Sequence, residues 1–256
     1  MNEQELARRR AQRKRAMRNR RRLFFAVVIL VLLLGLVGVG RLLKVREVTV
    51  QGVHILSAEQ VQEAAAIRPG ESLYGFSKNY AQKRLKGLPY VKEAKVRRTL
   101  FGNVRIDITE RTPVGQIFDA GGYVLVDDTL TLLQSTPEFD ADFITMQGIH
   151  MNAPKPGKIL FTSDKQKPMG DMVRALLQSP VREQIQTMHL TEKECILTTK
   201  DQVRVIFESY SDGPYKVKQF EEVLKKIQSM KKKVSTIYMD RGDNPIAVTE
   251  DTKRAD

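Results

Sequence analysis

Three histidines, one cysteine and a pair of aspartates are the residues of this chain whose types could support chemistry. His54, His150 and His189 are far apart in the sequence and share no spacing typical of metal ligands. Cys195 has no adjacent His or Cys, and its strand-like surroundings favour a buried structural thiol over a reactive one. A single cysteine also excludes an intramolecular disulfide. These residues therefore predict neither a catalytic centre nor a metal site.

The adjacent Asp127 and Asp128 are an equally weak candidate for acid–base chemistry. Neighbouring strand residues point to opposite faces, so the pair is better interpreted as part of a turn. Arg241-Gly242-Asp243 is likewise typical of an ordinary turn rather than of an adhesion motif. No nucleophile elbow, phosphate-binding loop, dinucleotide fingerprint or zinc-protease motif is present in the sequence. We therefore predict a non-enzymatic protein without cofactor or small-molecule ligand.

The N-terminal region predicts a membrane anchor. Residues 1–22 carry nine Arg and one Lys against two Glu, so this tail supplies +8 of the net charge of +13. The next 18 residues, 23–40, contain no polar side chain and would span roughly 27 Å as a helix. With Arg41 snorkelling, Leu42 and Leu43 extend the span. The positive-inside rule then leaves the tail in the cytoplasm and the rest of the 256 residues outside, as in a single-pass type II protein.

Two alternatives exist for this region. A cleaved signal peptide would use the small residues Gly38-Val39-Gly40, but its apolar core is usually 7–15 residues long. The basic tail could also bind nucleic acid, but contact with anionic lipid is the better interpretation in this position. We therefore predict a cytoplasmic tail at 1–22 and a transmembrane helix at 23–43, with the lipid bilayer and not nucleic acid as the partner of the anchor.

The segment after the anchor has a β-α-α-β-β pattern, so the outside part is an α+β fold. Alternating apolar residues predict strands around Val48, Ala94 and Val104. Ser57 and Gln60 form a capping box that starts the first helix, which Pro69-Gly70 should stop. A second helix is expected from near Ser77, with its apolar face formed by Ala81, Leu85 and Leu88.

The remaining residues predict a β-rich domain with flanking helices. Two hairpins are expected, Tyr123 to Leu133 around Asp127-Asp128-Thr129, and Glu194 to Phe207 around Thr199-Lys200-Asp201. Helices are expected at 172–178 and 215–230, and a final strand at 234–239. Residues 135–158 are predicted to be rich in loops, and 249–256 to be a disordered tail.

Residues 45–114 resemble the POTRA module of the bacterial cell-division family FtsQ, which is called DivIB in many Gram-positive species. The resemblance lies in VREVTVQGVHILSAEQV and in LKGLPYVKEAKVRRTLFGNVRIDITERTPVG. Gly115 departs from the Ala usual in the family, and Thr129-Leu130 replaces the Gly of its next hairpin. The resemblance implies a POTRA domain at 45–113 and a curved extracytoplasmic β domain at 114–248.

The resemblance also implies a function at the division septum of the bacterial plasma membrane, which in a two-membrane cell is the inner one. Such a protein is a non-catalytic scaffold of the divisome that binds FtsB (DivIC) and FtsL outside the membrane and supports septum formation. We expect binding by strand addition, with the sheet ending at 234–239 and offering its unpaired edge. The predicted partner-binding residues are Ile237, Tyr238, Met239 and Asp240, with Tyr238 as the main anchor because Tyr is enriched at hot spots.

Two other functions are alternatives to this one. An outer-membrane assembly factor also uses POTRA domains, but it would carry a long barrel or several POTRA repeats, for which 256 residues leave no room. A membrane-anchored cell-wall enzyme would need a pocket of convergent titratable groups. The sequence favours neither.

Overall fold

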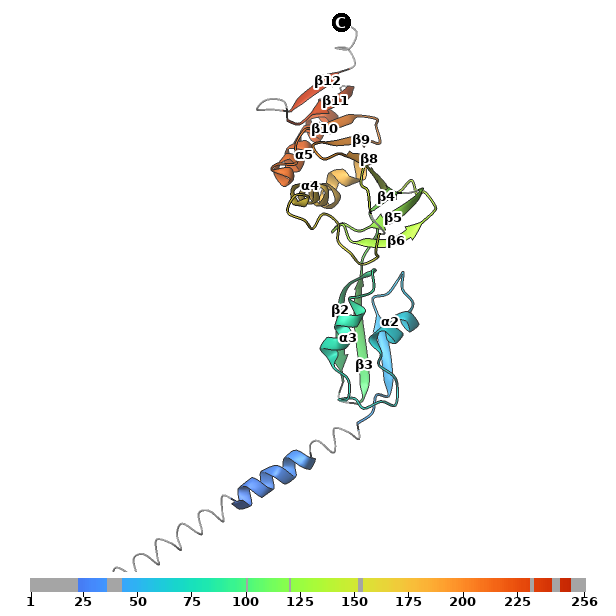
Figure 1. The fold of residues 1–256 in the computed structure, drawn as a ribbon, viewed down its shortest axis with the longest axis vertical. Coiled ribbons are helices and arrows are strands. Elements are labelled where there is room, and N and C mark those ends of the chain that lie inside the picture. The colour runs from blue at the N-terminus through green and yellow to red at the C-terminus, as the bar shows by residue number, and fades with distance from the viewer. Residues whose placement is uncertain are drawn as a thin grey trace, which may run out of the picture. The chain divides into compact units, whose positions relative to one another are not determined.

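The computed structural model describes residues 23–35, 43–99, 101–119, 121–151, 154–230, 233–240 and 245–249. The chain divides into two compact units (Figure 1). The first comprises residues 1–85 and 94–108, and the second comprises 86–93 and 109–256. The predicted cytoplasmic tail at 1–22 lies outside the described residues. So does the predicted disordered tail at 249–256, apart from Thr249, which ends a strand.

The predicted β-α-α-β-β order is confirmed in residues 47–110. The elements are β1 (Glu47–Gln51), α2 (Ala58–Ala65), α3 (Lys78–Leu85), β2 (Val91–Arg98) and β3 (Asn103–Glu110). The three strands form a sheet in the order β1-β3-β2, in which β1 runs parallel to β3. This order puts the last strand in the centre, because the two helices carry the chain from one edge of the sheet to the other.

Local signals set the ends of the first helix. The Ser57 side chain accepts a hydrogen bond from the Gln60 amide at 3.1 Å, and Gln60 Oε1 accepts one from the Ser57 amide at 3.0 Å. This is the predicted capping box. The helix ends four residues before Pro69, because Ala66 adopts a left-handed conformation with φ of 51°. The apolar face then packs inward, with Val61 and Ala65 buried.

Residues 23–35 are helical and their side chains are exposed. The remainder of the predicted span, apart from Leu43, falls on 36–42, outside the described residues. Among the residues that the structure describes, no helix is both long and apolar enough to cross a membrane.

The second unit is built on a nine-stranded mixed sheet in the order β12-β11-β10-β9-β8-β7-β4-β5-β6. Its strands are β4 (Gly115–Asp119), β5 (Gly122–Val126), β6 (Leu132–Thr136), β7 (Ile144–Gln147), β8 (Ile185–Leu190), β9 (Cys195–Thr199), β10 (Arg204–Phe207), β11 (Val234–Tyr238) and β12 (Ile246–Thr249). Both predicted hairpins are confirmed, as the antiparallel pairs β5–β6 and β9–β10. Three strands that the sequence did not reveal, β4, β7 and β8, join these hairpins into one sheet, and a fourth, β12, lies at its outer edge beyond β11.

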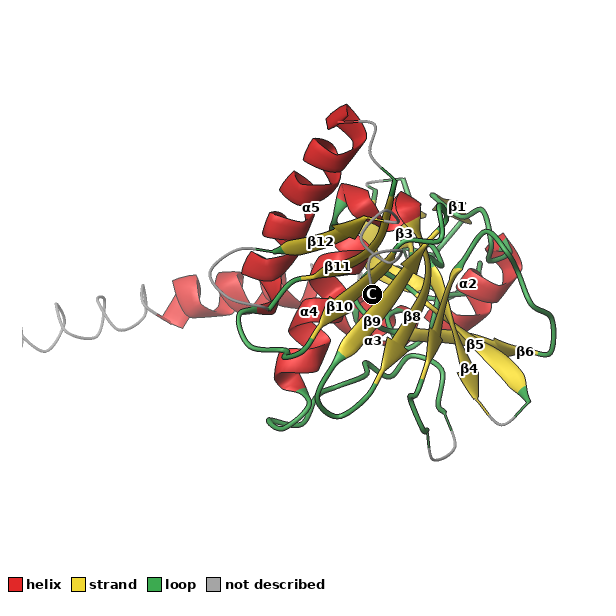
Figure 2. Cartoon of the chain, turned by 90° about the horizontal axis from the view of Figure 1, so that it is seen from above, coloured by secondary structure: helices red, strands yellow, loops and turns green. Residues whose placement is uncertain are grey.

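Two helices pack on one face of this sheet (Figures 1 and 2). They are α4 (Lys167–Gln178), which starts five residues earlier than predicted, and α5 (Gly213–Met230). The short 3-10 helix η1 (Pro180–Gln184) follows α4. Phe220 of α5 meets Phe207 of β10 edge to face, with ring centroids 5.9 Å apart. These aromatic rings and the buried side chains of alternate strand residues form the core between helices and sheet.

In the turn between β5 and β6, a leucine takes the left-handed conformation for which the family usually has a Gly. Leu130 adopts the left-handed conformation itself, with φ of 63°, at a cost of roughly 1–2 kcal/mol. Its side chain is fully buried, and burying a Leu contributes about 1.5–3 kcal/mol. Burial in the core therefore offsets the backbone strain that a Gly would avoid.

Candidate partner-binding surface

The outer edge of the nine-stranded sheet is formed by β12. This strand pairs antiparallel with β11, with Ile237 opposite Ala247 and Tyr238 opposite Ile246. The prediction that the sheet ends at 234–239 with an unpaired edge is therefore wrong: the strand is present as β11, but β12 covers its outer side. Among the described residues, no strand pairs with the far side of β12. The backbone edge that a partner strand could extend is thus that of 246–249.

The opposite edge of the same sheet is partly covered. Leu132 of β6 donates to the carbonyl of Lys158 at 2.8 Å and accepts from the amide of Gly157 at 2.7 Å. A further bridge joins Thr131 to Ile159. These bonds occupy backbone groups that strand addition at β6 would need. The two edges therefore differ, and β12 offers the better template for another chain.

A row of side chains crosses the sheet face opposite α4 and α5 and ends at β12. Strand partners lie on one face, so the register aligns six residues in adjacent strands. They are Gln147, His189, Ile196, Ile206, Tyr238 and Ile246. All six are half-buried or exposed, and Ile246 at the edge is 47% exposed. The last four members form an apolar strip that leads to the edge.

The predicted contact residues fall on both faces of β11. Ile237 is fully buried and Met239 nearly so, and both belong to the core between sheet and helices. Tyr238 is half-buried and lies on the opposite face, within the apolar row. Only Tyr238 among these three therefore presents its side chain on the face that leads to the edge.

Asp240 has an internal role at the end of β11. Its carboxylate accepts a hydrogen bond from the Glu208 amide at 2.7 Å and forms an ion pair with Lys216 of α5. Both side chains of the ion pair are about 14% exposed or less. Lys216 also donates to the carbonyl of Ser209 at 2.9 Å. Asp240 thus connects β11, the loop after β10, and α5, and it holds the last residues of β11 in place.

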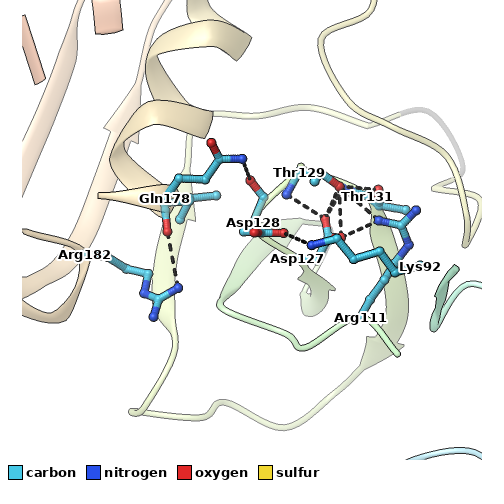
Figure 3. Close-up of polar contacts among 9 residues, drawn as sticks. Lys92, Arg111, Asp127, Asp128, Thr129, Thr131, Gln178 and Arg182 are labelled. Atoms are coloured by element: carbon cyan, nitrogen blue, oxygen red, sulfur yellow. Dashed lines mark hydrogen bonds and ion pairs between the residues drawn. The ribbon is translucent and has the colours of Figure 1, made fainter. Parts of the chain in front are cut away.

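A second polar cluster surrounds the aspartates at 127 and 128 (Figure 3). The Asp127 carboxylate is 1% exposed and forms an ion pair with Arg111 at 2.6 Å. It also accepts bonds from the backbone amides of Thr129 and Thr131, at 2.9 and 2.8 Å. Asp128 forms an ion pair with Lys92 at 3.6 Å. The two carboxylates thus have separate partners, and the prediction that they belong to a turn is confirmed.

The electrostatics of Asp127 indicate a structural group rather than an acid catalyst. Burial raises its pKa, but hydrogen bonds from Thr131, Thr129 and Arg111 outweigh burial and hold the pKa below its ordinary value. A general acid at neutral pH needs the opposite shift. The cluster therefore stabilises the turn between β5 and β6 and keeps the carboxylate ionised.

This lowered pKa makes the stability of the second unit depend on pH. The ionised Asp127 contributes stability that is fully present above the unfolded-state pKa of about 4 and is lost as the pH falls through the lower folded-state value. We expect Asp127→Asn to be less stable than the wild type at pH 7, and the difference to shrink below about pH 4. Urea unfolding followed by circular dichroism between pH 7 and pH 2 measures this difference in the free energy of unfolding. A difference that is constant over this range would contradict the assignment.

The other reactive groups of the second unit are committed to packing. Cys195 is fully buried in β9, as predicted, and burial raises the pKa of its thiol. A groove of about 1060 Å³ lies beside Tyr210, but the Tyr210 hydroxyl is already 2.8 and 2.7 Å from the carbonyls of Thr191 and Glu194. No group of three or more His, Cys, Asp or Glu side chains in the described part of the chain could hold a metal ion.

Comparison with known proteins relates residues 43–111 to one family. The family model described as "POTRA domain, FtsQ-type" matches residues 43–111. The cell division protein FtsQ of Anaeromyxobacter sp. is 27% identical over 118 residues, which cover 46% of this chain and 40% of that protein. FtsQ of Corynebacterium glutamicum is 34% identical over 86 residues, which cover 34% of this chain and 39% of that protein. The resemblance to the FtsQ/DivIB family is thereby confirmed.

The matches span about 40% of the length of these curated relatives. A solved structure, the major extracytoplasmic domain of the trans isomer of the cell division protein DivIB from Geobacillus stearothermophilus, is also similar. It matches 47% of this chain and 97% of its own length, with 15% identity and a TM-score of 0.32.

Proposed function

We propose that this chain, whose residues 43–111 match the FtsQ-type POTRA domain, is a single-pass membrane scaffold of the bacterial division machinery. Residues 23–43 anchor it in the cell membrane, residues 1–22 stay in the cytoplasm, and the two units act outside, at the septum. The protein binds and does not catalyse. Its partners are the extracytoplasmic parts of FtsB (DivIC) and FtsL homologues.

The observation that carries this proposal is that β12 is the outermost described strand of the nine-stranded sheet, so that its outer edge can accept another strand. A partner strand that pairs with the outer side of β12 extends the sheet, and its backbone groups replace water at the outward-facing N–H and C=O groups of residues 246–248. Side chains of the added strand then meet Ile246, the edge member of the apolar row, and Tyr238 lies one strand further in. Backbone pairing supplies affinity, and the row supplies specificity.

The predicted contact residues take different parts in this proposal. Tyr238 contacts the partner directly, because it lies next to Ile246 on the face of the row. Ile237 and Met239 act through the core by holding β11 against the helices. Asp240 positions the end of β11 through Lys216.

The proposal is tested by capturing FtsB and FtsL homologues with the full chain in detergent micelles. We expect the intact chain to bind them and Tyr238→Ala to bind about tenfold more weakly, the effect typical of an interface aromatic residue. The matched control is Tyr215→Ala, which removes a 63% exposed tyrosine from α5 and should leave capture unchanged. Equal capture by both variants would remove Tyr238 from the interface, and no capture by the intact chain would refute the proposed function.

A further inference from the structure

An exposed cluster of three aromatic rings lies in the half of the sheet remote from β12. Phe118 of β4 and Tyr123 of β5 are strand partners with ring centroids 5.4 Å apart. Phe139, in the loop after β6, is 5.7 Å from Tyr123. Phe118 is 45% exposed and Phe139 is 58% exposed. Contiguous exposed aromatic surface of this kind is typical of interaction sites, because leaving it in water is unfavourable.

The sequence around these rings is strongly acidic in an otherwise basic chain. Residues 112–154 contain six Asp or Glu and no Lys or Arg, although the chain has a net charge of +13. Two of the six, Asp127 and Asp128, are paired with Arg111 and Lys92. A third, Asp142, lines a groove with Arg182 and Lys200. Asp119 follows Phe118 within β4 and therefore lies on the opposite face of the strand. The remaining two, Glu138 and Asp140, flank Phe139 in the loop after β6.

A buried glutamine fixes the loop that carries half of this surface. Gln116 of β4 is fully buried, and its Nε2 donates to the Asp140 carbonyl at 2.7 Å. Its Oε1 accepts from the Asp140 amide at 3.2 Å. The Asp140 carboxylate in turn accepts from the Asp142 amide at 2.9 Å. Residues 138–140 are thus held against β4 by bonds to both backbone groups of Asp140. A surface fixed in this way loses little conformational entropy on binding.

We propose that Phe118, Tyr123 and Phe139, together with Glu138 and Asp140, form a docking site for an arginine-containing segment of a partner protein. We call these five residues the aromatic–acidic patch. A guanidinium group stacks on aromatic faces and pairs with carboxylates, so it satisfies both kinds of side chain at once. Anionic lipid and nucleic acid are disfavoured, because the carboxylates of the patch repel phosphate.

The patch is separate from the edge proposed above to bind FtsB and FtsL homologues. In the order of the nine strands, β4 and β5 lie in the half remote from β12. One sheet could therefore hold two partners at the same time. The proposal does not depend on the divisome function, since it rests on the charges and rings of the patch alone.

Binding of a labelled peptide to the full chain in detergent micelles tests the proposal. The probe is Gly-Arg-Ser-Gly-Arg-Ser-Gly-Arg-Ser with blocked ends, and its partner probe has citrulline in place of arginine. Because the chain as a whole is cationic, general electrostatics oppose binding of the arginine peptide. We expect it to bind in low salt, and the citrulline peptide to bind at least about tenfold more weakly.

Each of two variants removes one half of the patch. Glu138→Gln/Asp140→Asn removes the charges but keeps the Asp140 side-chain acceptor, and we expect about tenfold weaker binding. Phe118→Ala/Phe139→Ala removes the two exposed rings and should weaken binding about fivefold. The matched controls are Asp164→Asn/Glu192→Gln and Phe101→Ala/Tyr215→Ala, whose side chains are exposed elsewhere. These controls should bind like the wild type.

Three outcomes would overturn the proposal: no binding of the arginine peptide to the wild type, equal weakening by patch and control variants, or equal binding of the citrulline peptide. A labelled chito-oligosaccharide serves as a further probe. If it binds through Phe118 and Phe139 while the arginine peptide does not bind, the patch is a glycan site and the proposal is wrong. Capture of FtsB and FtsL homologues by the same variants should be unchanged, so failure of one proposal can be told from failure of the other.

Discussion

Replacing Arg111 by methionine is expected to lower the free energy of unfolding of the second unit by about 3 kcal/mol. The substitution keeps most of the apolar volume of the side chain but removes the charge opposite the Asp127 carboxylate, which is 1% exposed. Breaking a buried ion pair typically costs about 3–5 kcal/mol, because the remaining charge is left without its partner. The bonds from Thr129 and Thr131 remain, so the lower end of that range applies.

The single cysteine of the chain reports on this unit specifically. Cys195 is fully buried in β9, so a thiol reagent labels it only when the second unit opens. Labelling as a function of urea concentration therefore gives the unfolding midpoint of this unit alone. We expect the Arg111→Met midpoint to fall clearly below that of the wild type.

The matched control is Arg174→Met in α4. Arg174 forms an ion pair with Asp171 at 2.5 Å, close to the 2.6 Å between Arg111 and Asp127. The Arg174 and Asp171 side chains, however, are 27% and 41% exposed. An exposed pair contributes about 1 kcal/mol or less, so this variant should shift the midpoint little. Similar shifts for the two variants would show that burial of Asp127 does not decide the effect.

Proline at one of two adjacent positions of β12 is expected to weaken partner capture about 100-fold without unfolding the protein. Successive residues of a strand direct their N–H groups to opposite edges, so Ala247→Pro and Val248→Pro affect different sides of β12. In one variant the lost N–H faces β11, and the hairpin is disrupted. In the other it faces the outer edge, where proline is tolerated in the fold but obstructs an added strand. We expect this second variant to bind about 100-fold more weakly, the equivalent of two to three lost hydrogen bonds.

Amide hydrogen exchange shows which of the two proline variants has lost the outward-facing N–H: in that variant the β11 amides stay protected from exchange, because the hairpin with β12 is intact. Capture of FtsB and FtsL homologues is then measured for that variant, with deletion of residues 250–256 as a control that leaves β12 in place. The deletion should bind like the full chain. If the protected proline variant also captures its partners normally, strand addition at β12 is excluded and another surface must carry the binding.

Features set by neighbouring residues could be predicted from the sequence. The capping box of Ser57 and Gln60, both hairpins, and α5 with its buried Val217 and Phe220 depend on signals a few residues apart. In β10, Val205 and Phe207 face the core and alternate with the less buried Arg204 and Ile206. The strand at 234–239 was also predicted.

Long-range pairing could not be predicted in this way. β7 has only four residues, three of them buried, so Ile144 to Gln147 lacks the alternation of a half-buried strand. It becomes a strand because it pairs in parallel with β4 and β8, which lie about 30 and 40 residues away along the chain. β12 is equally short, and missing it placed the free edge one strand too early. The Arg111–Asp127 pair joins residues 16 positions apart, a contact that no local pattern indicates.

The difference between the two sheet edges limits which assemblies can form by pairing of edge strands. Residues 157–160 bond to the backbone of 130–132 at one side, whereas β12 is the outermost strand described at the other. A sheet with two open edges can stack end to end into fibrils, as amyloid does. With the other side partly covered, a second copy that pairs through its own β12 gives a closed twofold pair in preference to a longer stack. A heterologous strand at β12 then competes directly with self-association.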